Sequence, residues 1–115
     1  MDQRKKELRE QYMNRRPDMG VVCWTCGEHI WAAVTTDAAA EYNSTVFQLK
    51  LGSWPNREMQ RLYNQSPDAF QWSLAKKLKY EDPTKDYSDD LQLLMLEFAD
   101  EHPEAQPMSP RKKWK

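Results

Sequence analysis

The residues best suited to chemistry in this 115-residue chain are two cysteines and a histidine. Cys23, Cys26 and His29 form a C-x2-C-x2-H pattern, which could hold a metal ion or carry thiol redox chemistry. A structural zinc site normally needs four ligands from two pairs, and the sequence holds no second pair. The surrounding pattern is typical of a β-hairpin, where residues three apart face opposite sides. We therefore expect Cys23 and Cys26 to be ordinary core and turn residues. A thiol redox or metal-binding module is kept as an alternative function.

A second group of functional side chains is cationic. Lys50, Arg57 and Arg61 flank the turn Gly-Ser-Trp-Pro-Asn, which contains Trp54. Cationic groups beside an exposed aromatic ring can contact phosphates and stack on a base. These four residues are therefore the candidate nucleic-acid-binding residues, and we expect Trp54 to be partly exposed. The alternative interpretation is that the three cations simply form a solvent-exposed helix face.

The overall composition limits the class of protein. Charged residues make up 30% of the chain but balance to a formal net charge of -1. Dedicated nucleic-acid-binding domains are normally basic, so the balance favours a protein partner and leaves weak nucleic-acid binding as an alternative. No apolar run approaches 18 residues and no signal-peptide pattern occurs, so we expect a cytoplasmic protein without a membrane segment.

The periodicity predicts an α+β domain in the order α-β-β-α-α-β-α, with a small antiparallel sheet that starts as a hairpin. Asp37 can cap a helix that Gly52 ends, and Ser88 can cap the last helix. Trp72 and Phe98 are expected to be buried. The helices are expected over residues 2–16, 37–51, 56–64 and 88–101, and the strands over 20–25, 28–35 and 70–74.

The domain is expected to span residues 1–102. Residues 103–115 contain three prolines and end in Arg-Lys-Lys-Trp-Lys, which predicts a flexible basic tail.

Two segments resemble one known family. Residues 16–21 run RPDMGV before the first strand, and residues 47–60 run FQLKLGSWPNREMQ. This layout resembles a small bacterial single-domain subfamily of GIY-YIG nuclease-like domains, over about residues 6–102. The resemblance implies a hairpin built from a GIY-type and a YIG-type strand. It also implies DNA cleavage by two tyrosines, an arginine and a glutamate that binds a divalent metal ion.

Other residues occupy the positions that carry this chemistry in the family. Val22 and Trp31 stand where the two tyrosines belong, and Ser44 stands near the place of the arginine. Met95 stands where the glutamate belongs. Glu97 lies two residues further on, about 200° around the helix, so it should face solvent.

The register of the hairpin supports this assignment of the tyrosine positions. With Cys26 and Gly27 as the two turn residues, Val22 lies directly across from Trp31 on one face. Trp24 and His29 then share that face.

These replacements remove the groups that hydrolysis needs. Valine is inert, tryptophan offers only an N–H donor, serine has no charge, and methionine is no ligand for a hard cation. We therefore expect no catalytic residues, no cofactor and a catalytically degenerate domain that acts as a binding or regulatory module. The alternative is an active, magnesium-dependent GIY-YIG-type DNA endonuclease whose catalytic residues lie in another register.

Overall fold

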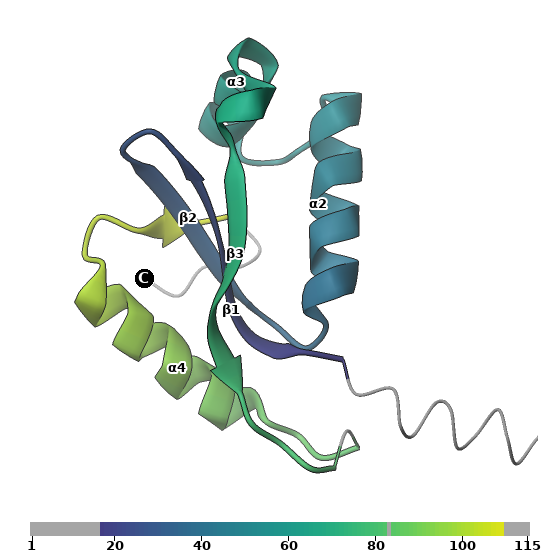
Figure 1. The fold of residues 1–115 in the computed structure, drawn as a ribbon, viewed down its shortest axis with the longest axis vertical. Coiled ribbons are helices and arrows are strands. Elements are labelled where there is room, and N and C mark those ends of the chain that lie inside the picture. Colours follow the sequence, from purple (N-terminus) through teal and green to yellow (C-terminus); the bar gives the residue numbers. More distant parts are fainter. Residues whose placement is uncertain (1–16, 83, 110–115) are drawn as a thin grey trace, which may run out of the picture.

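The computed structural model describes residues 17–82 and 84–109 and shows an α+β fold (Figure 1). The predicted helix over residues 2–16 and the last six residues of the predicted tail lie outside the described residues. The elements in chain order are β1 (Met19–Cys26), β2 (His29–Thr35), α2 (Ala38–Leu51), α3 (Arg57–Gln65), the 3₁₀ helix η1 (Pro67–Ala69), β3 (Gln71–Leu78), α4 (Ser88–Glu101) and β4 (Gln106–Pro107). The predicted fold class is confirmed.

The four strands form one sheet in the order β3-β1-β2-β4. Strand β1 pairs antiparallel with both β2 and β3, whereas β4 pairs parallel with β2. The sheet is therefore mixed and not wholly antiparallel as predicted, because β4 was not foreseen. Helices α2 and α3 lie on one side of the sheet and α4 lies on the other (Figure 1).

The β1–β2 hairpin is confirmed, but its predicted register is wrong by two residues. Trp24, and not Val22, lies opposite Trp31, and the pair that closes the turn is Cys26 with His29. The turn consists of Gly27 and Glu28. Gly27 adopts a φ of 59°, a positive value that glycine reaches without the steric cost that other residues meet. A shift of two residues preserves the face of every side chain, so Val22, Trp24 and Trp31 still share one face as predicted.

The helix boundaries follow local capping chemistry for α2 and α3. Asp37 accepts a hydrogen bond from the Ala40 amide at the start of α2, and Gly52 ends that helix with a φ of 76°. Asn56 caps α3 through the Met59 amide. The prediction for α4 is wrong at its start, because Tyr87 occupies the capping position and Ser88 instead bonds to Asp86.

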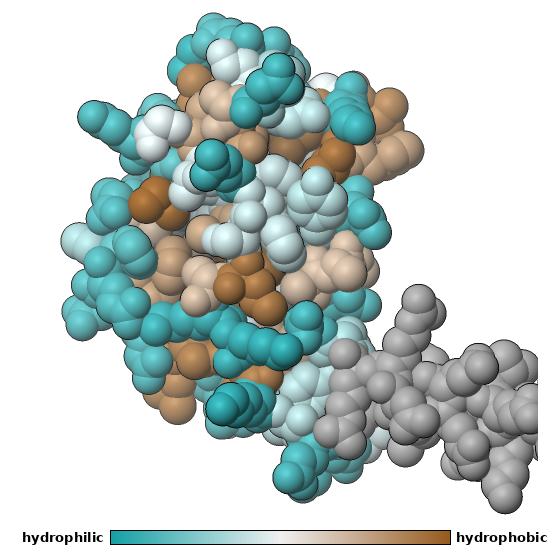
Figure 2. All heavy atoms as spheres, in the orientation of Figure 1, coloured by the Kyte–Doolittle hydropathy of each residue, from teal (hydrophilic) through white to brown (hydrophobic). Residues whose placement is uncertain are grey.

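Each face of the sheet has its own hydrophobic core. The core under α2 and α3 contains Val22, Trp24, Trp31, Ala33, Ala38, Leu49, Trp54, Met59 and Met108. The core under α4 contains Val21, Cys23, Ala32, Met95, Phe98 and Ala105. Phe98 is buried as predicted, but Trp72 is only half-buried because β3 is an edge strand. On the face shown in Figure 2, hydrophilic residues predominate with hydrophobic groups between them.

A bulge interrupts the pairing of β1 with β3. The register shifts between Val21 and Val22, which pair with Lys76 and Leu74. Gly20 lies just before this bulge with a φ of 155°, and a Cβ atom there would lie 1.8 Å from the Lys76 carbonyl oxygen. Only glycine therefore allows the two backbones to approach this closely.

The predicted domain boundary at residue 102 is too early. Ala105, Met108 and Ser109 are buried, and β4 adds to the sheet beside β2. The Met108 amide also donates to the Ala32 carbonyl oxygen over 3.1 Å. The chain therefore belongs to the folded domain at least through Ser109. Among the helices of the described segments, none is long and apolar enough to cross a bilayer.

Candidate functional site

The four positions that should correspond to the family's catalytic residues do not form one site. Val22 and Trp31 face the core under α2 and α3, whereas Met95 lies in the core on the opposite face of the sheet. All three side chains are at most 2% exposed. Ser44 is exposed on α2, and its hydroxyl oxygen accepts a hydrogen bond from Gln48. A substrate could reach only one of the four positions.

The face that carries Val22 and Trp31 is filled by stacked aromatic rings. The Trp31 and Phe70 rings stack with centroids 5.6 Å apart, and Trp24 stacks on Tyr42 at the same separation. Tyr42 in turn meets Trp72 edge-on at 5.2 Å. These contacts support the interpretation of this face as core, because the rings cover much of one another's surface, although Tyr42 itself is 40% exposed.

The magnesium ion that the resemblance implies does not fit these positions. A hard divalent cation takes oxygen ligands, and valine, tryptophan and methionine provide none. Within residues 17–82 and 84–109, no group of three or more His, Cys, Asp or Glu side chains is arranged to hold a metal ion. Glu97, two residues after Met95 in the sequence, is 63% exposed as predicted, and its carboxylate lies 3.9 Å from the Lys76 ammonium nitrogen.

The two cysteines lie on opposite faces of β1. Cys23 belongs to the core under α4, and its sulfur lies 3.2 Å from the Ser73 hydroxyl oxygen. Cys26 packs against the core on the other face. Both are free thiols. A shared metal ion or a bond between Cys23 and Cys26 would require the hairpin to be rebuilt, as the alternation of strand side chains predicts.

Arg57, Arg61 and Trp54 of the predicted basic patch line a hollow of about 540 Å³, which we call the cationic hollow, whereas Lys50 does not line it. Its walls come from the α2–α3 turn and from α3, and they are formed by Gly52, Ser53, Trp54, Pro55, Arg57, Gln60, Arg61 and Asn64. Arg57 and Arg61 are one helical turn apart, and Lys50 is exposed at the end of α2. No carboxylate lines the hollow, and within the described residues no ion pair engages these three cations.

Trp54 has a different role from the one predicted. Its side chain is only 7% exposed, so it offers no free ring to a base. Its indole N–H donates to the Met108 carbonyl oxygen over 3.1 Å, and its backbone N–H donates to Gln60 over 3.0 Å. The buried Gln60 amide also donates to the Leu49 carbonyl oxygen. Trp54 and Gln60 therefore hold the walls of the cationic hollow in place.

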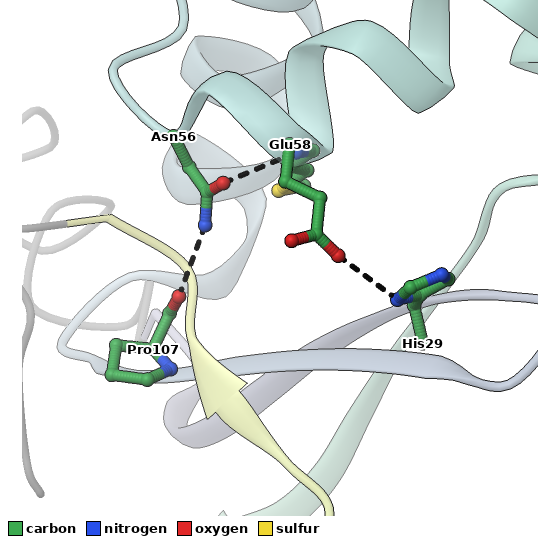
Figure 3. Close-up of polar contacts among 5 residues, drawn as sticks. His29, Asn56, Glu58 and Pro107 are labelled. Atoms are coloured by element: carbon green, nitrogen blue, oxygen red, sulfur yellow. Dashed lines mark hydrogen bonds and ion pairs between the residues drawn. The ribbon is translucent and has the colours of Figure 1, made fainter.

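A second depression, which we call the acidic cleft, lies between the hairpin tip, the start of α3 and β4. It has a volume of about 600 Å³. Its lining consists of Glu28, His29, Ile30, Trp31, Pro55, Asn56, Arg57, Glu58, Glu104, Gln106, Pro107 and Ser109. Figure 3 shows two of the contacts that shape it, from Asn56 to the Pro107 carbonyl oxygen and from Glu58 to His29.

The partner of His29 was missed in the sequence, which suggested no carboxylate near it. The His29 Nδ1 atom lies 3.2 Å from a carboxylate oxygen of Glu58, and the imidazole stacks on the Trp31 ring. Both side chains are about half exposed. The two residues lie 29 positions apart on separate elements, so only the packing of α3 beside the hairpin reveals the pair.

Comparison with known proteins agrees with the fold. No protein-family model matches the sequence, and no curated protein matches it significantly. Among solved structures, the chain is similar to the catalytic domain of the intron endonuclease I-TevI, solved as a point mutant. The TM-score is 0.58 at 15% sequence identity, and the match covers 73% of this chain and 82% of that chain. The fold is GIY-YIG-like. At this identity the likeness concerns the arrangement of helices and strands alone.

Proposed function

We propose that this chain is a catalytically degenerate GIY-YIG-like domain that binds nucleic acid through the cationic hollow without cutting it. The observation that carries the proposal is the contrast between two regions of the fold. Three of the four positions expected to hold catalytic residues contain buried apolar side chains, Val22 and Trp31 on one face of the sheet and Met95 on the other. The cationic hollow, in contrast, is open, concave and lined by two arginines without a carboxylate.

The chemistry of the hollow fits phosphate groups. A guanidinium group matches a phosphate with two parallel N–H donors, and Arg57 and Arg61 present two such groups from one helix face. Lys50 does not line the hollow but adds a third positive charge in the last turn of α2. With Trp54 buried, base stacking contributes nothing here, so binding depends on the phosphate backbone and is independent of sequence. The hollow thus favours nucleic acid over the protein partner that the net charge suggested.

The direct test is a titration of labelled single- and double-stranded oligonucleotides, followed by fluorescence anisotropy. A non-specific site of this kind should bind with a dissociation constant of about 10⁻⁴ to 10⁻⁶ M at physiological salt. For duplex DNA, log K falls as log salt rises, and each lost phosphate contact reduces the magnitude of this negative slope by about 0.9. Arg57→Ala/Arg61→Ala should therefore weaken binding and reduce the magnitude of that slope by about 2.

The matched control removes two positive charges elsewhere. Lys79 and Lys85 are exposed around the loop after β3, away from the hollow. Lys79→Ala/Lys85→Ala should bind within about twofold of the wild type, because only charges within about a Debye length of 10 Å act strongly. Equal losses in both double variants would show that net charge, and not the hollow, governs binding. Absence of binding at about 50 mM salt would exclude the hollow and favour a protein partner.

A further inference from the structure

Helix α2 carries apolar side chains on two faces. On its inward face, Ala38 and Leu49 pack into the core. On its outward face, Phe47 and Leu51 are both 64% exposed and lie one helical turn apart. Figure 2 shows hydrophobic groups gathered at the outer side of the C-terminal half of this helix. A helix that is apolar on both faces is normally covered on both, so the outward face points to an occupant.

Phe47 offers the free aromatic ring that Trp54 does not. Among the Phe, Tyr and Trp side chains of residues 17–82 and 84–109, Phe47 is the most exposed, followed by Tyr42 at 40%. Tyr42 already stacks on Trp24, whereas no ring contact in this part of the chain involves Phe47. The Phe47 ring is therefore available to a planar group that approaches from solvent.

The segment that joins Phe47 to the cationic hollow is positively charged. Lys50 is exposed one turn along the helix from Phe47, and Gly52 and Ser53 line the hollow. Phe47 precedes Gly52 by five residues, which is about 7.5 Å along a helix axis. Residues 47–57 include two cations and no carboxylate. This charge favours an anionic occupant that continues from the hollow along α2.

We propose that the cationic hollow and Phe47 together bind single-stranded nucleic acid, with an unpaired base stacked on the Phe47 ring. The inference deepens the proposed function and rests on it. Stacking on an aromatic side chain is available to every base, because every base has a π-face. In a duplex each base is already stacked on its neighbours, so only a single strand has a base free to cover the ring. Leu51 provides further apolar surface beside the ring.

The test is an anisotropy titration with a single strand, with the same strand made abasic, and with the duplex. The abasic strand keeps the phosphates but has no base to stack. The wild type should bind the intact strand about 5- to 150-fold more tightly than the abasic strand, as expected for one stacked base. Phe47→Ala and Phe47→Leu should remove this preference, whereas Phe47→Tyr should keep it. All three should bind the duplex within about twofold of the wild type, because phosphate contacts remain.

The matched control is Leu93→Ala, which removes an apolar side chain that is 60% exposed on α4, on the other side of the sheet. This variant should keep the wild-type preference. Duplex binding without any preference for the intact strand, or a preference that survives in Phe47→Ala, would overturn the inference and leave the hollow as a phosphate site. Absence of binding to all three ligands would overturn the proposed function as well.

A second copy of the chain is the other candidate occupant of this face. Sedimentation of the free protein distinguishes it, because stacking on a base predicts a monomer. Self-association that Phe47→Ala/Leu51→Ala abolishes, together with equal binding of the intact and abasic strands, would assign the face to a second copy and overturn the inference.

Discussion

The Trp54 indole N–H donates a hydrogen bond to the Met108 carbonyl oxygen over 3.1 Å. This contact joins the turn between α2 and α3 to the segment that follows β4, 54 residues further along the chain. It lies inside the core, since Trp54 is 7% exposed and Met108 is fully buried. The cationic hollow and the acidic cleft meet at this turn, because Pro55 and Arg57 line both.

Replacing this indole should therefore weaken the fold. Trp54→Phe leaves the Met108 carbonyl oxygen without its partner, which should lower the free energy of unfolding by about 1–3 kcal/mol. Urea denaturation measures the loss. Trp72→Phe is the matched control, because the Trp72 indole nitrogen has no hydrogen-bond partner among the described residues. If both variants lost equal stability, the Trp54–Met108 hydrogen bond would contribute nothing.

Gly20 should tolerate no side chain. An added Cβ atom would lie 1.8 Å from the Lys76 carbonyl oxygen, so β1 and β3 would have to separate at the bulge. Gly20→Ala should cost at least about 1–3 kcal/mol in thermal or urea unfolding. Gly27→Ala is a useful comparison, since no atom lies within 4 Å of its Cβ position and only the positive φ is strained. A Gly20 variant as stable as the Gly27 variant would contradict the close approach.

Thr45 offers a stabilising substitution. Its side chain is 1% exposed, and its hydroxyl group is buried without a hydrogen-bond partner among the described residues. Thr45→Val keeps the shape and removes the unsatisfied group, which should raise the free energy of unfolding by about 1–3 kcal/mol. Thr45→Ser, which keeps the hydroxyl and loses the methyl group, should be less stable than the wild type. A destabilised valine variant in urea denaturation would show that the hydroxyl is satisfied.

The ion pair between β3 and α4 should make stability depend on pH. The hydrogen bond from Lys76 lowers the pKa of Glu101, and the same bond raises the pKa of Lys76. The stabilisation from Glu101 is therefore complete above the ordinary glutamate pKa and is lost as pH falls through the lowered value. The stabilisation from Lys76 is complete below the ordinary lysine pKa and is lost as pH rises through the raised pKa of Lys76.

Glu101→Gln removes this pair and so provides the measurement. The stability difference between wild type and variant should be largest near neutral pH and should vanish in strong acid and in strong base. Asp100→Asn, a neighbouring exposed substitution on α4, should show no such profile. If the difference in free energy of unfolding between wild type and Glu101→Gln stayed constant from acid to base, the ion pair could not be its cause.

Helix boundaries and strand faces could be predicted because they depend on residues that are neighbours in the sequence. Asp37 and Gly52 bound α2 through capping chemistry that any helix with these residues would use. The alternation of Trp72, Leu74 and their polar neighbours predicted a strand with one buried face, and β3 has that pattern. The shared face of Val22 and Trp31 also followed, because face depends only on whether the separation is odd or even.

The site was less predictable because it depends on distant contacts. Trp54 appeared exposed beside a proline, but the returning segment around Met108 buries it. That segment contains prolines and lacks a regular periodicity, so nothing local marks it as part of the sheet. The His29–Glu58 pair likewise arises only when α3 packs beside the hairpin tip. Arg57 and Arg61 could be placed together from the sequence because they are one helical turn apart, and both line the cationic hollow.

The most direct test of the proposed function is a cleavage measurement under conditions where the nucleic acid is bound. Supercoiled plasmid and branched DNA are incubated with Mg²⁺ or Mn²⁺ at protein concentrations that saturate binding in the anisotropy titration. We expect binding without nicking above background, because Val22, Trp31 and Met95 provide no group for hydrolysis. Metal-dependent cleavage by the wild type that Glu97→Ala abolishes would contradict it and would place an active nuclease centre on α4.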